Sequence, residues 1–230
     1  MTAPLPLARY LDAAVLKPET TRDEAVAAIK KCLELETATV CVRPCDIALA
    51  QELCAGSNTG VCVVLGFPHG CGLTAGKVAE AQLYVDAGVD EIDMVANYGW
   101  AKSGRWDDVE ADIAAVTAVT RPAGVPLKVI FETSQLDLAQ VARLTEASIT
   151  VGADFVKTST GFNGSGATEE AVEMMLKTAA GRIKVKPSGG IRDAVRAQRF
   201  VDLGVDRLGV NWASCEAIIS GATPADGQGY

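Results

Sequence analysis

Gly88-Val-Asp-Glu-Ile-Asp93 recurs in form twice more along the chain, as Gly152-Ala-Asp-Phe-Val-Lys157 and Gly204-Val-Asp-Arg-Leu-Gly209. Each glycine can adopt the left-handed conformation that ends a helix, and the apolar residues after it predict a strand. The sixth position of the pattern therefore falls at one register of three strands, where Asp93, Lys157 and Gly209 stand. This internal repeat favours a fold built from repeated strand–helix units.

Short apolar runs alternate with longer segments of helical period on both sides of this pattern. The runs that predict strands are residues 10–16, 38–42, 61–66, 91–95, 127–132, 155–159, 183–186 and 207–210. Among the helical segments, Thr21-x-x-Glu24 has the form of a capping box. Eight such alternations predict a single (β/α)8 TIM barrel, with a doubly wound open sheet as the alternative. We expect the barrel to occupy residues 1–222 and residues 223–230 to form a flexible tail.

The composition indicates an acidic globular protein. Hydrophobic residues make up 49% of the chain and charged residues 22%, which excludes disorder and provides for a large core. A net charge of −8 argues against nucleic acid or an anionic membrane as the main partner. No apolar run approaches the roughly 20 residues of a membrane span. The seven cysteines form no Cys-x-x-Cys pair, so we expect free thiols in the cytoplasm.

Three lysines stand inside apolar runs that predict strands. Lys128 lies in Pro-Leu-Lys-Val-Ile-Phe, Lys157 in Asp-Phe-Val-Lys-Thr-Ser and Lys186 in Ile-Lys-Val-Lys-Pro-Ser. One buried lysine is as readily structural as functional, but three on consecutive strands favour a functional cluster. Alternate strands of a barrel share an interior layer, so Asp93 and Lys157 should point into one space, where Gly209 leaves room.

Such a cluster supports amine catalysis. A free lysine has a pKa of about 10.4, whereas burial and a second ammonium group both favour the neutral amine. A neutral amine adds to a carbonyl to give a Schiff base, whose protonated imine stabilises an adjacent carbanion. A carboxylate such as Asp93 can move the protons, directly or through a water molecule.

Two glycine-rich segments follow strands late in the chain. Ser188-Gly-Gly-Ile-Arg192 is predicted to open a helix, so its backbone N–H groups can hold a phosphate, and residues 160–166 form a second loop. Such turns are often only structural, but loops after the late strands of a barrel frequently bind phosphate. The chain has one histidine, His69, and no histidine pair that would indicate a metal site.

Several segments match the motifs of one known family. They are Leu11-Asp-Ala-Ala-Val-Leu-Lys-Pro18, Val40-Cys-Val-Arg-Pro44, Val64-Leu-Gly-Phe-Pro-His-Gly70, Glu91-Ile-Asp-Met-Val95, Leu127-Lys-Val-Ile-Phe-Glu-Thr133, Asp154-Phe-Val-Lys-Thr-Ser-Thr-Gly-Phe162 and Val185-Lys-Pro-Ser-Gly-Gly-Ile-Arg192. On these residues the chain resembles class I deoxyribose-phosphate aldolase over nearly its whole length. The resemblance implies a barrel that reversibly cleaves 2-deoxy-D-ribose 5-phosphate to acetaldehyde and D-glyceraldehyde 3-phosphate, without a metal or organic cofactor.

The resemblance also implies roles for individual residues. Lys157 would be the Schiff-base lysine and Asp93 the acid and base that works through a water molecule. Lys186 would be the neighbouring ammonium that favours the neutral form of Lys157 and joins the proton relay. Lys128 would orient Asp93, and Tyr230 would assist proton transfer at the acetaldehyde methyl group. The implied substrate-binding residues are Asp12, Cys41, Thr158, Gly161, Gly189, Gly190, Arg192, Gly209 and Asn211.

The chain departs from the family pattern at two places. Ala13 and Ala14 stand where the family often has His-Thr. The last strand runs into Gly209-Val-Asn-Trp-Ala213, where the family often has a small hydroxyl pair that helps to hold phosphate. We expect Asn211 and Trp212 to remove small donors and to add bulk beside the anion site. Weaker use of phosphate should follow.

Other interpretations stay open. A related lysine-barrel aldolase could act on another sugar phosphate or on an unphosphorylated sugar or aldehyde. A phosphosugar isomerase would need a carboxylate base but no imine, and a silent sugar-phosphate-binding barrel would lack the nucleophile or the relay. Since Lys157, Lys186 and Asp93 are all present, the silent barrel ranks last. The expected partners are small aldehydes and sugar phosphates, and the family resemblance implies a homodimer or homotetramer.

Overall fold

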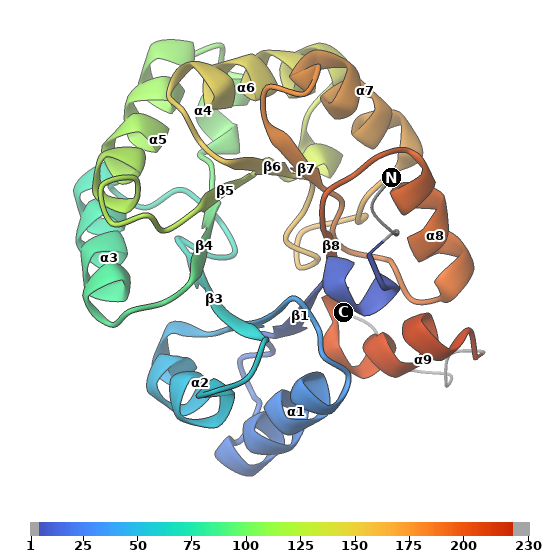
Figure 1. Ribbon diagram of the computed structural model, residues 1–230. Coiled ribbons are helices and arrows are strands. Elements are labelled where there is room, and N and C mark those ends of the chain that lie inside the picture. Colours follow the sequence, from blue (N-terminus) through green and yellow to red (C-terminus); the bar gives the residue numbers. More distant parts are fainter. Residues whose placement is uncertain (1–4, 223–230) are drawn as a thin grey trace.

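Eight parallel strands stand at the centre of the molecule and helices surround them (Figure 1). The computed structural model describes residues 5–222. The strands are β1 Leu11–Val15, β2 Thr39–Val42, β3 Gly60–Leu65, β4 Glu91–Val95, β5 Leu127–Ile130, β6 Phe155–Lys157, β7 Lys184–Lys186 and β8 Leu208–Asn211. All eight predicted strands are confirmed, with ends that differ by two residues at most.

The strands follow one another around the sheet in the order β7-β6-β5-β4-β3-β2-β1-β8. A parallel bridge between Ser188 and Gly209 joins the two outer strands. Across the same seam, Gly209 N donates to Pro187 O at 2.8 Å, and Asp206 N donates to Val185 O at 3.0 Å. The sheet thus closes into the predicted (β/α)8 barrel, and the doubly wound open sheet is excluded.

Nine α-helices are found in residues 5–222. They are α1 Arg22–Glu34, α2 Ile47–Cys54, α3 Thr74–Asp86, α4 Tyr98–Lys102, α5 Trp106–Thr120, α6 Leu138–Thr150, α7 Glu169–Ala179, α8 Ala194–Asp202 and α9 Cys215–Ser220. The predicted capping box begins α1: Thr21 N donates to Glu24 Oε2 at 2.8 Å and Glu24 N donates to Thr21 Oγ1 at 3.4 Å. Such a cap stabilises a helix by about 1 kcal/mol. Within the same residues, no helix combines the length and the apolar character needed to cross a membrane.

The three copies of the Gly-apolar-Asp-x-apolar-x pattern each join the end of a helix to the start of a strand, as predicted. Gly88, Gly152 and Gly204 have φ angles of +78°, +75° and +92°, and they stand between α3 and β4, α6 and β6, and α8 and β8. A residue with a Cβ is disfavoured in this backbone region. The pattern therefore delivers its sixth residue to the same part of three strands.

The main hydrophobic core lies between the strands and the inner faces of the helices. A second, smaller apolar cluster consists of Leu16, Cys41, Cys62 and Val64, with Phe67 and Phe162 among the residues packed against it. The two phenylalanine rings meet edge to face, with centroids 5.1 Å apart. The small cluster forms an apolar wall beside the charged side chains of the barrel interior.

Candidate active site

A cavity opens at the carboxyl ends of the strands. Its lining comes from β1, β2, β6, β7, β8 and the loops that follow them: Asp12, Ala14, Leu16, Cys41, Lys157, Thr160, Lys186, Ser188, Gly189, Gly190, Ile191, Arg192, Gly209, Val210, Asn211 and Ser214. Barrel enzymes place their active sites at this end of the strands.

Two lysines share one carboxylate oxygen at the floor of the cavity. Lys157, at the end of β6, places its Nζ 2.7 Å from Asp93 Oδ2. Lys186, at the end of β7, places its Nζ 2.8 Å from the same oxygen. Asp93 is fully buried beneath them and does not line the cavity. The shared space predicted for Asp93 and Lys157 is confirmed.

Asp12 and Lys128 extend this contact in opposite directions. Lys186 Nζ lies 2.5 Å from Asp12 Oδ2. Lys128 is fully buried, and its Nζ donates to Asp93 Oδ1 at 2.6 Å. Lys128 therefore contacts the Asp93 carboxylate without lining the cavity, and its predicted orienting role stays a prediction.

The charges around Asp93 determine which groups hold protons. Burial works to raise the pKa of Asp93, but the charges of three lysines outweigh it and hold this pKa well below its usual range. Burial works to lower the pKa of Lys186, but the carboxylates of Asp12 and Asp93 outweigh it and raise this pKa. At neutral pH, Asp93 is therefore a carboxylate and Lys186 an ammonium group.

The two glycine-rich segments pack against each other at one side of the cavity. Ala167 N donates to Ser188 O at 3.0 Å and to Gly189 O at 3.1 Å. A Cβ on Gly166 would lie 2.2 Å from the backbone of Gly189, so only glycine allows this approach. The loops after β6 and β7 are thereby held as one unit.

The segment after β7 does not open directly into a helix, and that prediction is wrong. Helix α8 begins at Ala194, after an N-cap residue, Asp193, whose carboxylate accepts from Arg196 N at 2.8 Å. This carboxylate already occupies the helix terminus and disfavours an anion there. The residues of this segment that line the cavity and carry donors for an anion include Ser188, Gly189, Gly190 and Arg192.

The segment after β8 differs from expectation at Trp212. This side chain packs against the main hydrophobic core and borders a separate groove beside Lys17 and Glu24. It does not line the cavity, so the prediction that it adds bulk beside the anion site is wrong. Asn211 does line the cavity, and its Oδ1 accepts from Ala213 N at 3.0 Å.

Gly209 lies close beneath the loop that follows β7. A Cβ on it would lie 2.3 Å from Ser188 Oγ and 3.3 Å from Lys186 Cε. Thr158 and Gly161 stand outside the lining of the cavity. Thr158 Oγ1 instead accepts from Ser188 N at 2.9 Å and donates to Ser188 O at 3.1 Å, which braces the loop from behind.

Seven of the nine predicted substrate-binding residues line the cavity: Asp12, Cys41, Gly189, Gly190, Arg192, Gly209 and Asn211. Tyr230 lies outside the described residues, so its predicted role stays a prediction.

Two charged residues that the sequence analysis did not single out lie beneath the site. Glu91 Oε1 accepts from Arg207 Nη2 at 2.8 Å, and Glu91 Oε2 lies 2.7 Å from Lys128 Nζ. Glu91 and Arg207 each hold the fourth position of the repeated pattern, two residues before Asp93 and Gly209. Because strand residues two apart share a face, the pattern itself carried the signal for this second layer.

A third residue, Glu132, joins the loops after β5 and β6. It is fully buried, with a left-handed φ of +56°, and it accepts from Thr160 N at 3.2 Å and from Asn163 Nδ2 at 3.4 Å. Burial raises its pKa. A non-glycine residue in this backbone region is held there by its surroundings. Glu132 thus orders the loop that contributes Thr160 to the cavity.

Cys41, Cys62 and Asp93 bring three potential metal-ligand atoms within 4.8 Å of one another. Cys62 Sγ itself lies 3.2 Å from Asp93 Oδ1. Both oxygens of Asp93 already accept from lysine ammonium groups, whose positive charges oppose a metal cation at this position. Cys41, Cys62 and Asp93 are therefore better suited to hold the lysine ammonium groups than to bind a metal ion.

Known proteins resemble this chain over most of its length. Residues 8–211 match the model of the DeoC/LacD family of aldolases. A deoxyribose-phosphate aldolase of Mannheimia succiniciproducens is 42% identical over 208 residues, which cover 90% of this chain and 92% of that protein.

Solved structures agree with the sequence relatives. An aldolase named QR15 superposes with a TM-score of 0.88 at 37% identity, covering 94% of this chain and 96% of that one. The deoxyribose phosphate aldolase from Aeropyrum pernix, described as a unique tetramer, superposes with a TM-score of 0.83 at 28% identity. That match covers 93% of this chain and 89% of the Aeropyrum chain.

Proposed function

The chain belongs to the DeoC/LacD family of aldolases, and from this premise we propose that Lys157 forms a Schiff base with 2-deoxy-D-ribose 5-phosphate. The protein is a deoxyribose-phosphate aldolase, a class I aldolase that reversibly releases acetaldehyde and D-glyceraldehyde 3-phosphate. One observation carries the assignment of Lys157: it lines the cavity while its Nζ contacts a buried carboxylate that a second ammonium group shares.

The first step is addition of the Lys157 amine to the aldehyde carbon of the open-chain sugar. Loss of the lysine proton relieves the repulsion between the two ammonium groups on Asp93 Oδ2 and frees the nitrogen lone pair. Addition and loss of water then give a protonated imine, which restores a positive charge beside Asp93. The 2.7 Å contact therefore serves both the ammonium and the imine.

The second step breaks the bond between C2 and C3 of the sugar. The C3 hydroxyl loses its proton, the C2–C3 electron pair moves into the imine to give an enamine, and glyceraldehyde 3-phosphate leaves. Lys186 lines the cavity whereas Asp93 lies beneath it, so we assign the relay to both. Asp93 accepts the proton through a water molecule, Lys186 lies between it and the substrate, and Lys128 is a positioning residue.

The last steps restore the enzyme. Protonation of the enamine carbon forms the methyl group, and hydrolysis of the imine releases acetaldehyde and frees Lys157. Tyr230 is proposed to assist this protonation. The protonated imine is itself the electron sink, so each step balances without a metal or an organic cofactor.

The phosphate end of the substrate is placed beside Gly189, Gly190 and Arg192. Asn211 stands near them in the cavity and uses its Oδ1 to cap the segment that follows β8. Ser214 also lines the cavity and retains one hydroxyl at this side. We propose that selectivity for the phosphorylated sugar is reduced, because Asn211, whose Oδ1 is held by Ala213 N, is a larger side chain than the small hydroxyl donor of the family pattern.

Product identification tests this function. The protein is incubated with 2-deoxy-D-ribose 5-phosphate, and proton NMR should show acetaldehyde and glyceraldehyde 3-phosphate in equal amounts. Lys157→Met should abolish both products, whereas Lys177→Met, at an exposed position of α7, should leave them unchanged. An isomeric sugar phosphate without acetaldehyde would support the isomerase instead. Cleavage of other sugars alone would support the related aldolase.

We also propose that the protein is a homodimer or homotetramer of the cytoplasm. The tetrameric relative from Aeropyrum pernix supports assembly, and a reducing compartment suits seven cysteines that are all free. Light scattering on the purified protein measures the assembly directly.

A further inference from the structure

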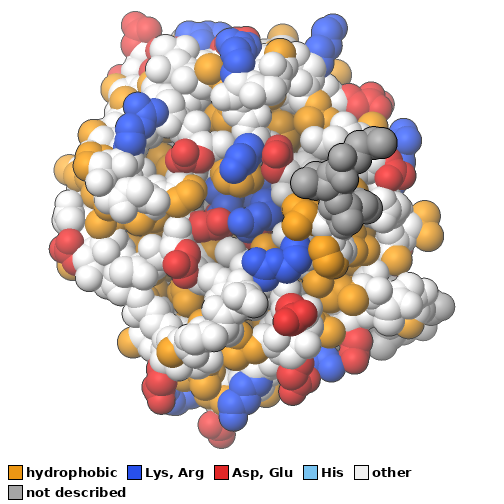
Figure 2. Space-filling view, viewed as in Figure 1, with side chains coloured by type: hydrophobic (Ala, Val, Ile, Leu, Met, Phe, Trp, Pro, Cys, Tyr) orange, Lys and Arg blue, Asp and Glu red, His pale blue; other side chains and the backbone are white. Residues whose placement is uncertain are grey.

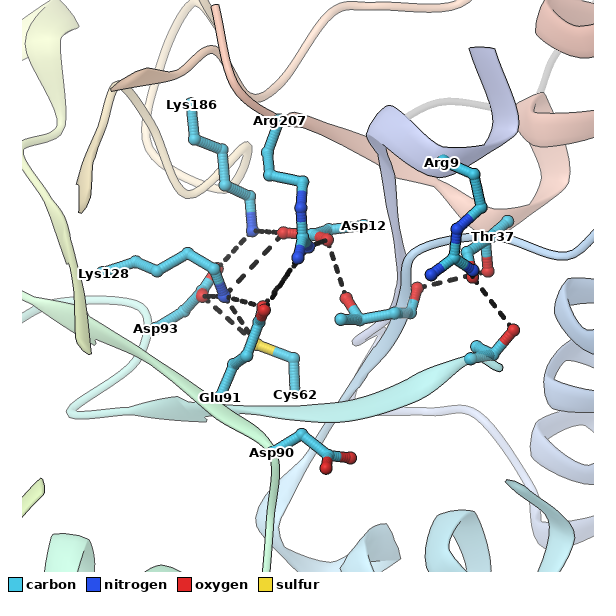
Figure 3. Close-up of polar contacts among 12 residues, drawn as sticks. Arg9, Asp12, Thr37, Cys62, Asp90, Glu91, Asp93, Lys128, Lys186 and Arg207 are labelled. Carbon is cyan, nitrogen blue, oxygen red and sulfur yellow. Dashed lines mark hydrogen bonds and ion pairs between the residues drawn. The ribbon is translucent and has the colours of Figure 1, made fainter. Parts of the chain in front are cut away.

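Six charged side chains, five of them buried and one partly buried, form a closed ring of alternating charge beneath the cavity, and Figure 3 shows all six in close-up. The ring runs through Asp12, Lys186, Asp93, Lys128, Glu91 and Arg207 and returns to Asp12. Its first five ion contacts measure 2.5, 2.8, 2.6, 2.7 and 2.8 Å, and Arg207 closes it on Asp12. Every member therefore has an opposite charge on each side.

Glu91 and Arg207 form the part of the ring that is farthest from the chemistry. Glu91 begins β4 and Arg207 precedes β8, whereas the cavity lies at the carboxyl ends of the strands. The Arg207 side chain is 20% exposed and the Glu91 side chain 11%, and neither lines the cavity. Figure 2 shows basic and acidic side chains gathered in the middle of one face, inside the circle of strands seen in Figure 1. The pair contacts the rest of the ring through Lys128 and Asp12, and its charges act on the site from a distance.

The charges of the ring cancel, and Lys157 is the charge in excess. The ring holds three carboxylates and three cations, and Lys157 adds a fourth cation through its contact with Asp93. Among the described residues, Lys157 has one carboxylate partner, Lys186 has two and Lys128 has three. Loss of a proton from Lys157 leaves a neutral cluster. Loss from Lys186 would take a cation from two buried carboxylates, and loss from Lys128 from three, whereas loss from Lys157 takes a cation from Asp93 alone and is the least costly.

We propose that Glu91 and Arg207 are positioning residues that keep the ring neutral from below, so that Lys157 carries the one proton in excess. This proposal rests on the proposed function of Lys157. Glu91 holds Lys128 on the side away from Asp93, and Arg207 holds Asp12 on the side away from Lys186. Removing either charge changes the net charge of the cluster that the Lys157 proton experiences.

Three further titratable groups surround Lys157 and Asp93 without joining the ring. They are Cys41 of β2, Cys62 of β3 and Glu132 after β5. Burial raises the pKa of the Cys62 thiol well above its usual range. A hydrogen bond with Cys62 lowers the pKa of the Cys41 thiol. All three groups are left intact in the variants below, so differences among those variants report the ring.

The test uses charge changes of opposite sign. In the cleavage of 2-deoxy-D-ribose 5-phosphate, the acidic limb of the kcat/KM–pH profile reports the form of the free enzyme in which the attacking amine is neutral. Arg207→Gln removes a positive charge and should move this limb to higher pH. Glu91→Gln removes a negative charge and should move it to lower pH. Each shift should be about one pH unit, for a unit charge several ångströms away at an effective dielectric constant of about 20.

Matched variants separate charge from structure. Glu91→Gln/Arg207→Gln removes one charge of each sign and should return the limb toward wild type. Arg207→Lys keeps the charge and should leave the limb in place. Arg182→Gln, which breaks an exposed pair with Glu146, should shift nothing. Circular dichroism confirms the fold of each variant, and KM should change less than kcat.

Shifts of opposite sign with cancellation in the double variant support the proposal. Shifts in the same direction, or losses of kcat with an unmoved limb, would overturn it. Where Arg207→Gln does not fold, the same decision rests on Glu91→Gln against the double variant. Borohydride trapping of acetaldehyde separates failure of this proposal from failure of the proposed function. An adduct on Lys157 together with an unmoved limb would remove only the positioning role of Glu91 and Arg207. The absence of an adduct in the wild type would remove the proposed function itself.

Discussion

Lys77 and Lys157 are both buried lysines paired with a buried aspartate, yet their surroundings differ. Lys77, on α3, lies 2.6 Å from Asp112 Oδ2 and donates to Val95 O at 3.2 Å. Thr74 Oγ1 donates to the other Asp112 oxygen at 2.7 Å. This pair has one charge of each sign and does not line the active-site cavity. Lys77 is therefore a structural lysine, although it is as deeply buried as Lys157.

Lys157 belongs to a cluster of four cations and three carboxylates, and it opens onto a cavity. The comparison teaches that burial of a lysine does not by itself indicate catalysis. A functional lysine is one whose proton is in excess over the nearby carboxylates and whose nitrogen a substrate can reach. Balanced pairs such as Lys77 with Asp112 stabilise the packing of helices against the barrel.

The largest expected effect sharpens this contrast at the reactive lysine. Lys157→Met should lower kcat by at least about 10⁴-fold, because loss of a covalent nucleophile removes the reaction path. Its free energy of unfolding should equal or exceed that of the wild type, because the substitution removes an excess buried charge. Steady-state kinetics and urea unfolding measure the two quantities. A Lys157→Met protein with wild-type activity would contradict the assignment.

The converse effect is expected at the structural lysine. Lys77→Met leaves Asp112 buried without its cation and should lower the free energy of unfolding by about 3–5 kcal/mol. The folded fraction should keep its kcat at 25 °C. Lys77→Met/Asp112→Leu should recover part of the lost stability. A large fall in kcat with unchanged stability would break the distinction between the two lysines.

Acid should weaken the ring of charges through its carboxylates. Burial works to raise the pKa of Asp12, but the charges of Lys186, Lys128 and Arg207 outweigh it and hold this pKa well below its usual range in the folded protein. A lowered folded-state pKa gives stability that is complete above the unfolded pKa and is lost as the pH falls. Unfolding free energy should therefore fall by roughly 2–3 kcal/mol from Asp12 between about pH 5 and pH 2.

Urea unfolding at a series of pH values measures this loss, with Asp12→Asn as the comparison. The variant should be less stable at neutral pH and should lose less stability on acidification. Parallel curves for the two proteins would show that Asp12 is not held ionised by the ring.

The smallest expected effect concerns the phosphate end of the cavity. Asn211→Ser returns a small hydroxyl and should raise the ratio of kcat/KM for 2-deoxyribose 5-phosphate over 2-deoxyribose about five-fold, which corresponds to roughly 1 kcal/mol for one hydrogen bond. Trp212→Phe, at a position outside the cavity, should leave the ratio unchanged. A wild-type ratio as high as in typical family members would remove the proposal of reduced selectivity.

Much of the fold and the centre of the site could be predicted from the sequence. The repeated pattern fixes the register of three strands, and the lysines inside apolar runs at Lys128, Lys157 and Lys186 point into the barrel interior. Asp93, Lys157 and Lys186 follow from these two observations. Helix α8 begins later than predicted because Asp193 supplies the N-cap. Aspartate is a preferred N-cap residue, so this start could have been predicted from the sequence.

Other features depend on contacts that local patterns do not describe. Strand alternation beyond Gly209 places Trp212 on the outer side of the barrel. The prediction that Trp212 lies beside the anion site rested on its size alone and did not use this alternation. The contact between Glu91 and Arg207 joins residues that are 116 positions apart, so only the closed barrel brings them together. The left-handed backbone of Glu132 likewise follows from its buried partners and not from its residue type.

Reductive trapping tests the central claim most directly. The folded protein is incubated with acetaldehyde, reduced with borohydride, digested, and searched by peptide mass spectrometry for an added two-carbon unit. Lys77, Lys128, Lys157 and Lys186 are all buried lysines, and the account predicts the adduct on Lys157 alone among them. An adduct on Lys186, or none on the folded protein, would contradict it.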